Sequence, residues 1–225
     1  MDDSEIFIHE FTKSAYARTL ESELGLPEDW ITFIAAEDDW SFVIKCHALL
    51  ESAANRALTE TLGRPNLLKF ISRLELSGER TGKVSLLVNL GHLDSDCKRF
   101  ISKLSELRNA LVHEVANTNL TINEYLEHLS ETDRKGFVKA FRWGITDWKT
   151  FNCAKLDQDD EAKSLFYISA ASSWQESQIF AIWLGVLFVL RRLHLAFQKE
   201  RMVQQEIVEL RELAQSVKNS LRSAQ

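Results

Sequence analysis

The sequence predicts an all-α protein, and three observations lead to that fold class. Only eight glycines and two prolines occur among 225 residues, although turns and strand edges use these two residue types heavily. Apolar residues recur at spacings of three and four over 39–63 and 95–116, which is the period of an amphipathic helix. From Val189 to Ala224 an apolar seam follows heptad spacing. We therefore expect a helical bundle with a long C-terminal helix.

The N-terminal half contains two helices with clear ends. Residues 4–24 form the first expected helix, which Gly25 and Pro27 terminate, and a short helical segment follows with an acidic start at Glu28 and Asp29. The clearest helix spans 39–63. Asp38 or Asp39 is its expected N-cap and Gly63 its end, and we expect its apolar residues to be buried: Phe42, Cys46, Leu49, Leu50, Ala53, Ala57 and Leu58.

The middle of the chain predicts a shorter helix over 66–76, an apolar segment broken at Gly91, and a helix over 95–116. Asp94 or Ser95 is the expected cap of the last of these. One stripe of this helix faces a core: Phe100, Leu104, Leu107, Leu111 and Val115. Residues 131–172 carry no clear pattern.

The C-terminal region predicts one helix from Trp174 almost to the last residue. Such a helix is about 70 Å long at 1.5 Å per residue, so its heptad seam pairs with a second chain or folds back over the body. Its apolar run from Ile179 ends at Arg191, short of the roughly 20 residues that cross a bilayer. We therefore expect a buried helix and no stable membrane association.

These elements divide the chain into an N-terminal helical extension (1–38), a core bundle (39–130) and a C-terminal helical region (131–225). The net charge of −6 argues against nucleic-acid binding by bulk electrostatics, but it leaves room for a small basic groove. Three scattered cysteines, with no CxxC or Cys/His cluster, predict a reducing cytoplasm and neither disulfides nor a metal site. Phosphate-binding glycine motifs are missing, so we expect no cofactor.

The 95–116 helix carries Arg108, Asn109 and His113 within six positions. A helix with these three residues is most often simply a solvated face. Arg108 and His113 lie five positions apart, about 140° around an ideal helix. A distorted helix end or a two-fold pairing of two such helices would bring them together. Imidazole can take or give the proton of a ribose 2′-OH, and guanidinium can stabilise the charge that develops on phosphate.

Arg-Asn-x-x-x-His late in a helical chain resembles the Arg-x(4–6)-His signature of the HEPN superfamily. The preceding pieces, Phe70, Arg73, Leu74 and the "NLGHL" turn, resemble HEPN-like families that include the mannitol operon repressors. The resemblance covers residues 39–120, and His92 departs from it, because an apolar residue is expected after Gly91.

The resemblance implies a bundle that dimerises through its motif helices. Many members resemble metal-independent endoribonucleases of toxin–antitoxin or phage-defence systems, in which Arg108 and His113 would carry the chemistry, Asn109 would support them, and Glu51 on an earlier helix would assist. Other members resemble non-catalytic regulators that bind proteins. We therefore expect a homodimer that cleaves RNA, with a possible antitoxin or regulatory partner. The alternative is an interaction module that acts through its dimer surface and C-terminal helix.

Three cations near the motif, Lys69, Arg73 and Lys103, are candidates for contact with an RNA backbone. The alternative, that they only balance an acidic chain, is about as good. His47 lies among apolar positions, so we expect it to be a core histidine whose hydrogen bonds are satisfied.

Overall fold

The structure, a computed structural model, describes residues 15–113, 120–143 and 178–223. No strand occurs among these residues, and a long helix forms the C-terminal end of the described chain, as the sequence predicts. The helices are α2 (Ala15–Leu24), α3 (Trp30–Ala35), α4 (Asp39–Thr61), the 3-10 turn η1 (Pro65–Leu67), α5 (Leu68–Ile71), α6 (Lys83–Asn89), α7 (Ser95–Val112), α8 (Ile122–His128), α9 (Glu131–Phe141) and α12 (Gln178–Ser223).

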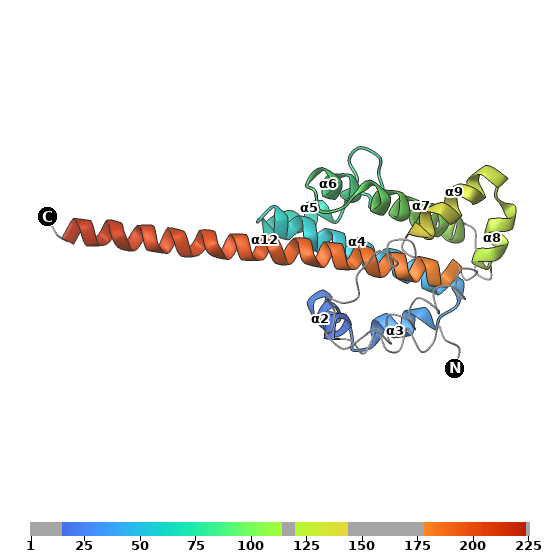
Figure 1. The fold of residues 1–225 in the computed structure, drawn as a ribbon, viewed down its shortest axis with the longest axis horizontal. Coiled ribbons are helices and arrows are strands. Elements are labelled where there is room, and N and C mark those ends of the chain that lie inside the picture. Colours follow the sequence, from blue (N-terminus) through green and yellow to red (C-terminus); the bar gives the residue numbers. More distant parts are fainter. Residues whose placement is uncertain (1–14, 114–119, 144–177, 224–225) are drawn as a thin grey trace, which may run out of the picture.

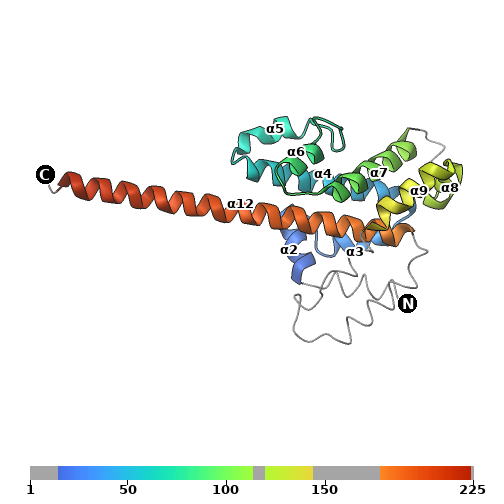
Figure 2. The same ribbon diagram turned by 45° about the horizontal axis from the view of Figure 1, so that its top comes forward.

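Three long helices form the centre of the protein. Arg56 of α4 lies over the ring of Phe197, and Glu60 lies 4.0 Å from Arg201, so α4 and α12 run in the same direction. Helix α7 runs opposite to both, because Trp40 Nε1 donates to the carbonyl of Leu111 while His47 contacts Ser105. Helices α2 and α3 lie on the other side of α12 from α5, α6 and α7 (Figure 1, Figure 2).

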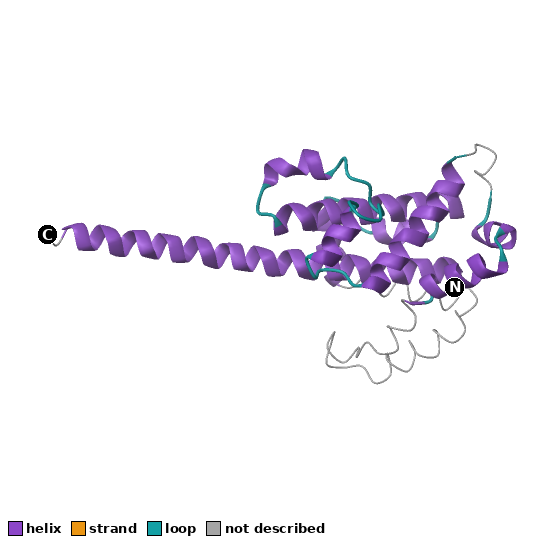
Figure 3. Cartoon of the chain, turned by 90° about the horizontal axis from the view of Figure 1, so that it is seen from above, coloured by secondary structure: helices purple, strands orange, loops and turns teal. Residues whose placement is uncertain are grey.

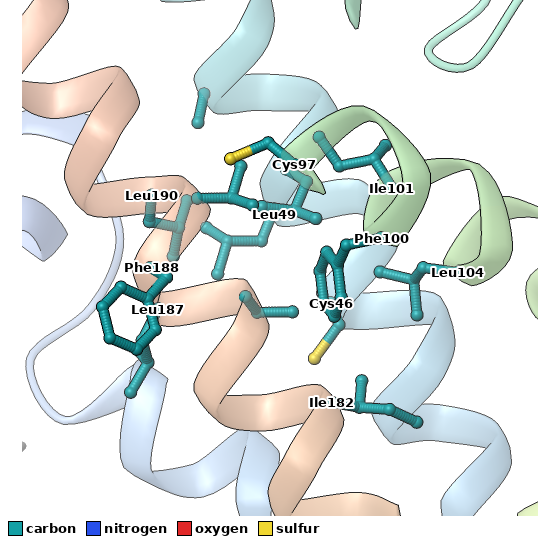
Figure 4. Packing of buried hydrophobic residues seen from close by; sticks show 14 of the residues in the cluster. Cys46, Leu49, Cys97, Phe100, Ile101, Leu104, Ile182, Leu187, Phe188 and Leu190 are labelled. Atoms are coloured by element: carbon teal, nitrogen blue, oxygen red, sulfur yellow. The ribbon is translucent and has the colours of Figure 1, made fainter. Parts of the chain in front are cut away.

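One hydrophobic core joins all three of the expected segments. It contains Ile31 and Ile34 of α3, the apolar residues of α4 and α7, Phe137 and Phe141 of α9, and the first part of α12. Figure 4 shows where α4, α7 and α12 meet: Cys46 and Leu49, Phe100 and Leu104, and Leu187 and Leu190 point into the same space. Every residue of α4 that we expected to be buried is buried.

Local capping explains where several helices begin. The side chain of Asp38 accepts from the Ser41 N–H at 3.0 Å, and that of Asp94 accepts from the Asp96 and Cys97 N–H groups. Both caps agree with the sequence. Helix α3 differs, because Asp29 makes no side-chain cap bond; the buried carboxylate of Glu21 accepts from the N–H groups of Asp29 and Ile31 instead.

Other expected ends are close to the observed ones. Gly25, Gly63 and Gly91 adopt positive φ just after α2, α4 and α6, a backbone conformation that is unfavourable for residues with a Cβ. The helix expected over 66–76 is shorter than predicted and is divided between η1 and α5. The starts expected at residue 4 and at Trp174, the end expected at Ala116, and the unclear region at 144–172 lie outside the described residues.

Helix α12 extends far beyond the other helices (Figure 3). Where it leaves the body, Arg201 lies 4.0 Å from Glu60 and the side chain of Gln204 lies beside Gly63. From Arg201 to Ser216 the side chains are exposed, except for half-buried Ile207. Among the described residues the helix does not fold back, so of the two arrangements expected from its length, pairing with another chain is the one still open.

The apolar start of α12 belongs to the core. A segment of this helix is long and apolar enough to cross a membrane, and 78% of its most apolar window is buried inside the protein. Its residues from Ala181 to Leu190 are all buried. This packing favours the interpretation as a core helix.

Candidate functional site

The Arg-Asn-x-x-x-His motif occupies the last turns of α7. Arg108 is half-buried, whereas Asn109 and His113 are exposed. Arg108 Nη1 donates to Asn109 Oδ1 at 3.0 Å, so the carboxamide holds the guanidinium of its sequence neighbour. This contact agrees with a supporting role for Asn109.

Helix α7 keeps regular geometry through the motif. The N–H of His113 donates to the carbonyl of Asn109 at 3.1 Å, and His113 has φ −73° and ψ −22°, both typical of an α-helix. A distorted helix end therefore does not bring Arg108 and His113 together. Within one chain they lie about 140° apart around the helix axis. A site that uses both residues on one phosphate needs a second copy of α7.

A different imidazole lies close to Arg108. His47 of α4 is half-buried, and its Nε2 lies 3.2 Å from Ser105 Oγ, one turn before Arg108 on α7. The hydroxyl of Ser105 donates its only proton to the carbonyl of Ile101 at 2.9 Å. Ser105 can therefore only accept from His47, which makes Nε2 the protonated ring nitrogen and leaves the Nδ1 lone pair available.

The environment of His47 favours its neutral form. Burial lowers the pKa of His47 below its usual 6.5; the carboxylate of Glu51 opposes this, and the positive charges of Arg108 and Lys83 lower the pKa further. An imidazole that is neutral near pH 7 can accept a proton. His47 was expected to be a satisfied core histidine; it is satisfied by Ser105 but only half-buried.

Glu51 lies one turn after His47 on α4 and makes an ion pair. Lys83 Nζ lies 2.5 Å from Glu51 Oε1 and 3.4 Å from the carbonyl of Ser72. The lysine is completely buried, whereas the carboxylate is 36% exposed. The carboxylate of Glu51 is already engaged by Lys83, so this geometry suits a positioning role for Glu51. His47, Glu51, Lys83, Ser105 and Arg108 are named the α4–α7 polar cluster below.

The three expected RNA-binding cations differ in their surroundings. Lys103 is half-buried and pairs with Glu106 at 2.5 Å, so part of its charge is already neutralised. Lys69 and Arg73 are exposed on and just after α5, and neither forms an ion pair with another described residue. The two α5 cations therefore remain available to an anion.

The described cysteines are structural. Cys46 and Cys97 are buried, and burial raises the pKa of both thiols, to about 12 for Cys97. Neither is suited to nucleophilic chemistry, because the reactive form is the thiolate. Cys153 lies outside the described residues. Within the described ranges no three His, Cys, Asp or Glu side chains come close enough to hold a metal ion.

Reasoning from the sequence missed His47 and Lys83 as members of the site. His47 meets a residue 58 positions away, and Lys83 meets one 32 positions away. Both pairs depend on how α4, α6 and α7 pack. The only local signal is the four-residue spacing of His47 and Glu51, which puts both on one face of α4.

Comparison with protein-family models, curated proteins and solved structures finds no match to this chain. The functional argument therefore depends on the residues themselves.

Proposed function

We propose that the protein is a metal-independent endoribonuclease of the HEPN type, acting in the cytoplasm as a homodimer in a toxin or phage-defence system. The observation that carries the proposal is a guanidinium, Arg108, held by Asn109 and lying near a neutral imidazole, His47. These are the groups that RNA cleavage without a metal requires.

The reaction needs a base, an acid and a cation. The base removes the proton of a ribose 2′-OH, and the freed oxygen attacks the adjacent phosphorus. The bond from phosphorus to the 5′-oxygen then breaks, and the leaving oxygen takes a proton from the acid. The products are a 2′,3′-cyclic phosphate and a 5′-hydroxyl. Arg108 stabilises the extra negative charge on the phosphate in the transition state.

Two imidazoles fit the two proton transfers. His113 acts as general base or acid from the exposed end of α7, and His47 provides a second imidazole on the Arg108 side. Because Arg108 and His113 occupy different faces of one helix, the proposal needs His113 of one subunit to approach Arg108 of the other across a two-fold axis. Glu51, held by Lys83, positions α4 and tunes His47 rather than transferring a proton.

RNA incubated with the protein in excess chelator tests the proposal. We expect Arg108→Ala and His113→Ala each to lose cleavage by a factor of at least about 100, the usual contribution of one charge-stabilising or one proton-transferring group. Asn109→Ala should lose less, and His47→Ala should alter the pH profile. His128→Ala removes an exposed histidine at the end of α8 and is the matched control. Equal cleavage by wild type and Arg108→Ala would identify a contaminant and end the proposal.

A second candidate function is a non-catalytic regulator that binds another protein, such as an antitoxin. The exposed segment of α12 from Arg201 to Ser216 favours this function, because Met202, Leu210 and Leu213 are each more than 60% exposed. Large apolar side chains in water commonly mark an interaction surface. The same incubation separates the two functions, since a folded homodimer that cleaves no RNA supports the regulator.

A further inference from the structure

The segment 62–74 is basic in an acidic protein. It contains Arg64, Lys69 and Arg73 and no Asp or Glu, whereas the whole chain has a net charge of −6. The segment forms the turn after α4, then η1 and α5, at the surface of the protein. All three cations are exposed. A small basic surface, which the negative net charge of the chain does not exclude, therefore occurs in segment 62–74.

These cations lack the carboxylate partners that seven other described cations have. The described lysines and arginines that form ion pairs with carboxylates are Lys45, Lys83, Arg99, Lys103, Lys135, Arg192 and Arg201. Arg64, Lys69 and Arg73 make no ion pair with any described residue. Their charge is therefore available to phosphates from outside the chain.

An exposed aromatic residue, Phe70, lies between Lys69 and Arg73 in the sequence. Phe70 is 64% exposed, although Phe42, Phe100, Phe137 and Phe141 are completely or almost completely buried. The neighbouring Leu68 is 48% exposed. Covering an exposed phenylalanine ring with a flat partner is favourable, because it removes apolar surface from water. The exposed ring and the free cations together distinguish this surface from an ordinary solvated helix.

We infer that Arg64, Lys69, Phe70 and Arg73 form a docking surface for single-stranded RNA, in which Phe70 stacks on a base and the cations contact the backbone. This inference rests on the proposed function, because it names the form of RNA that the nuclease takes. Single-stranded nucleic acid offers open base faces and phosphates at once, whereas a duplex hides its base faces. An acidic protein would satisfy the cations, but it does not offer a flat ring beside every negative charge, as a single strand of nucleic acid does.

The surface lies beside one end of the α4–α7 polar cluster. The carbonyl of Ser72, the residue before Arg73, lies 3.4 Å from Lys83 Nζ, and Lys83 pairs with Glu51 of α4. The surface therefore extends from the Glu51 side of the cluster along α5.

Fluorescence anisotropy with a labelled, single-stranded 2′-O-methyl oligonucleotide measures this binding. The oligonucleotide has no free 2′-OH, so binding is measured without cleavage. Phe70→Ala should weaken binding about 5- to 100-fold, the range for loss of one stacked base. Each of Arg64→Ala, Lys69→Ala and Arg73→Ala should reduce the slope of log K against log salt by about 0.7.

Two matched variants control for general effects. Phe33→Ala removes a phenylalanine that is 65% exposed on α3, and Arg134→Ala removes an exposed cation on α9 that forms no ion pair with a described residue. Neither should change binding. Because Phe70 is exposed, its replacement leaves the core intact, and circular dichroism should show this.

Three results would overturn the inference: no binding by the wild type at low salt, equal binding by the Phe70→Ala and wild-type proteins, or equal affinity for single strand and duplex. Loss of the dimer in Phe70→Ala during sedimentation would also overturn it, because the surface would then be a protein interface. Binding through Phe70 without cleavage of ordinary RNA would remove the nuclease proposal and leave this surface in place. Cleavage of RNA that does not depend on Phe70 would remove the docking surface and leave the nuclease proposal in place.

Discussion

The two halves of α12 belong to the same regular helix but have opposite environments. From Ala181 to Leu190 every side chain is buried against α4 and its neighbours, whereas from Arg201 to Ser216 nearly all are exposed. The heptad seam passes through both: Val189 and Leu193 are buried, while Leu210 is 64% exposed. An apolar seam therefore predicts that a helix needs a partner, but it does not identify that partner.

The largest expected effect concerns the buried half, at its closest approach to α7. A Cβ on Gly185 would lie 2.3 Å from Phe100 Cε2, so Gly185→Ala must displace a buried ring. We expect a loss of about 1–3 kcal/mol in the free energy of unfolding, measured by urea denaturation. Gly136→Ala is the control, because nothing lies within 4 Å of a Cβ there and alanine favours the α9 helix. A neutral Gly185→Ala would show that α12 packs more loosely than described.

A smaller loss is expected where the buried half is joined to the start of α7. Asp94 caps α7 through the N–H groups of Asp96 and Cys97 and also pairs with Arg192 of α12. Asp94→Ala should lower the free energy of unfolding by about 1–2 kcal/mol, mainly through loss of the cap. Asp38→Ala removes only the cap of α4 and should cost no more. If Asp38→Ala lowers the free energy of unfolding clearly more than Asp94→Ala does, the ion pair between Asp94 and Arg192 adds nothing to stability.

His47, on the polar side of α4, should make the stability of the fold depend on pH without adding much to that stability. The pKa of His47 is lower in the folded chain than its unfolded value of 6.5. Between these two values the unfolded chain binds the proton more tightly, so stability rises with pH and is lost as the pH falls through the folded pKa. His47→Gln should flatten this dependence below about pH 6.5, as followed by thermal unfolding. An unchanged profile would mean that His47 titrates normally.

The smallest effect on stability is expected in the exposed segment of α12, from Arg201 to Ser216. The double variant Leu210→Lys and Ala214→Lys should change the free energy of unfolding of the body by no more than about 0.5 kcal/mol, because both side chains are exposed in the single chain. Sedimentation equilibrium should nevertheless show a shift from dimer to monomer, because charges on the seam oppose pairing. Glu212→Lys changes an exposed residue off the seam and should leave the mass unchanged. If the double variant remains a dimer, the subunits pair elsewhere.

Local patterns were sufficient to predict several helix ends and the core of α4. Asp38 and Asp94 cap as expected, and Gly25, Gly63 and Gly91 follow helix ends, because capping and positive φ depend on a few neighbouring residues. Helix α3 shows the limit of such reasoning. Its N–H groups are capped by Glu21, a residue of the preceding helix, rather than by the acidic pair next to it.

The candidate site could be predicted only along α7. The positions of Arg108, Asn109 and His113 on one helix follow from their spacing, and the regular helix keeps Arg108 and His113 on different faces. The neighbours of Arg108 do not follow from spacing. His47 and Lys83 come from other helices, and they reach the site because α4, α6 and α7 pack side by side.

By itself the sequence determined the helical class, the length of α12 and the motif on α7, because hydrophobic period and capping act over a few residues. Only the tertiary structure decided that α12 is buried from Ala181 to Leu190 and exposed from Arg201 to Ser216, apart from half-buried Ile207. It also decided that burial, together with the nearby charge of Arg108, lowers the pKa of His47, and that Lys83 is buried against Glu51. Burial and charge at these positions depend on residues distant in the chain, and those are brought together by packing alone.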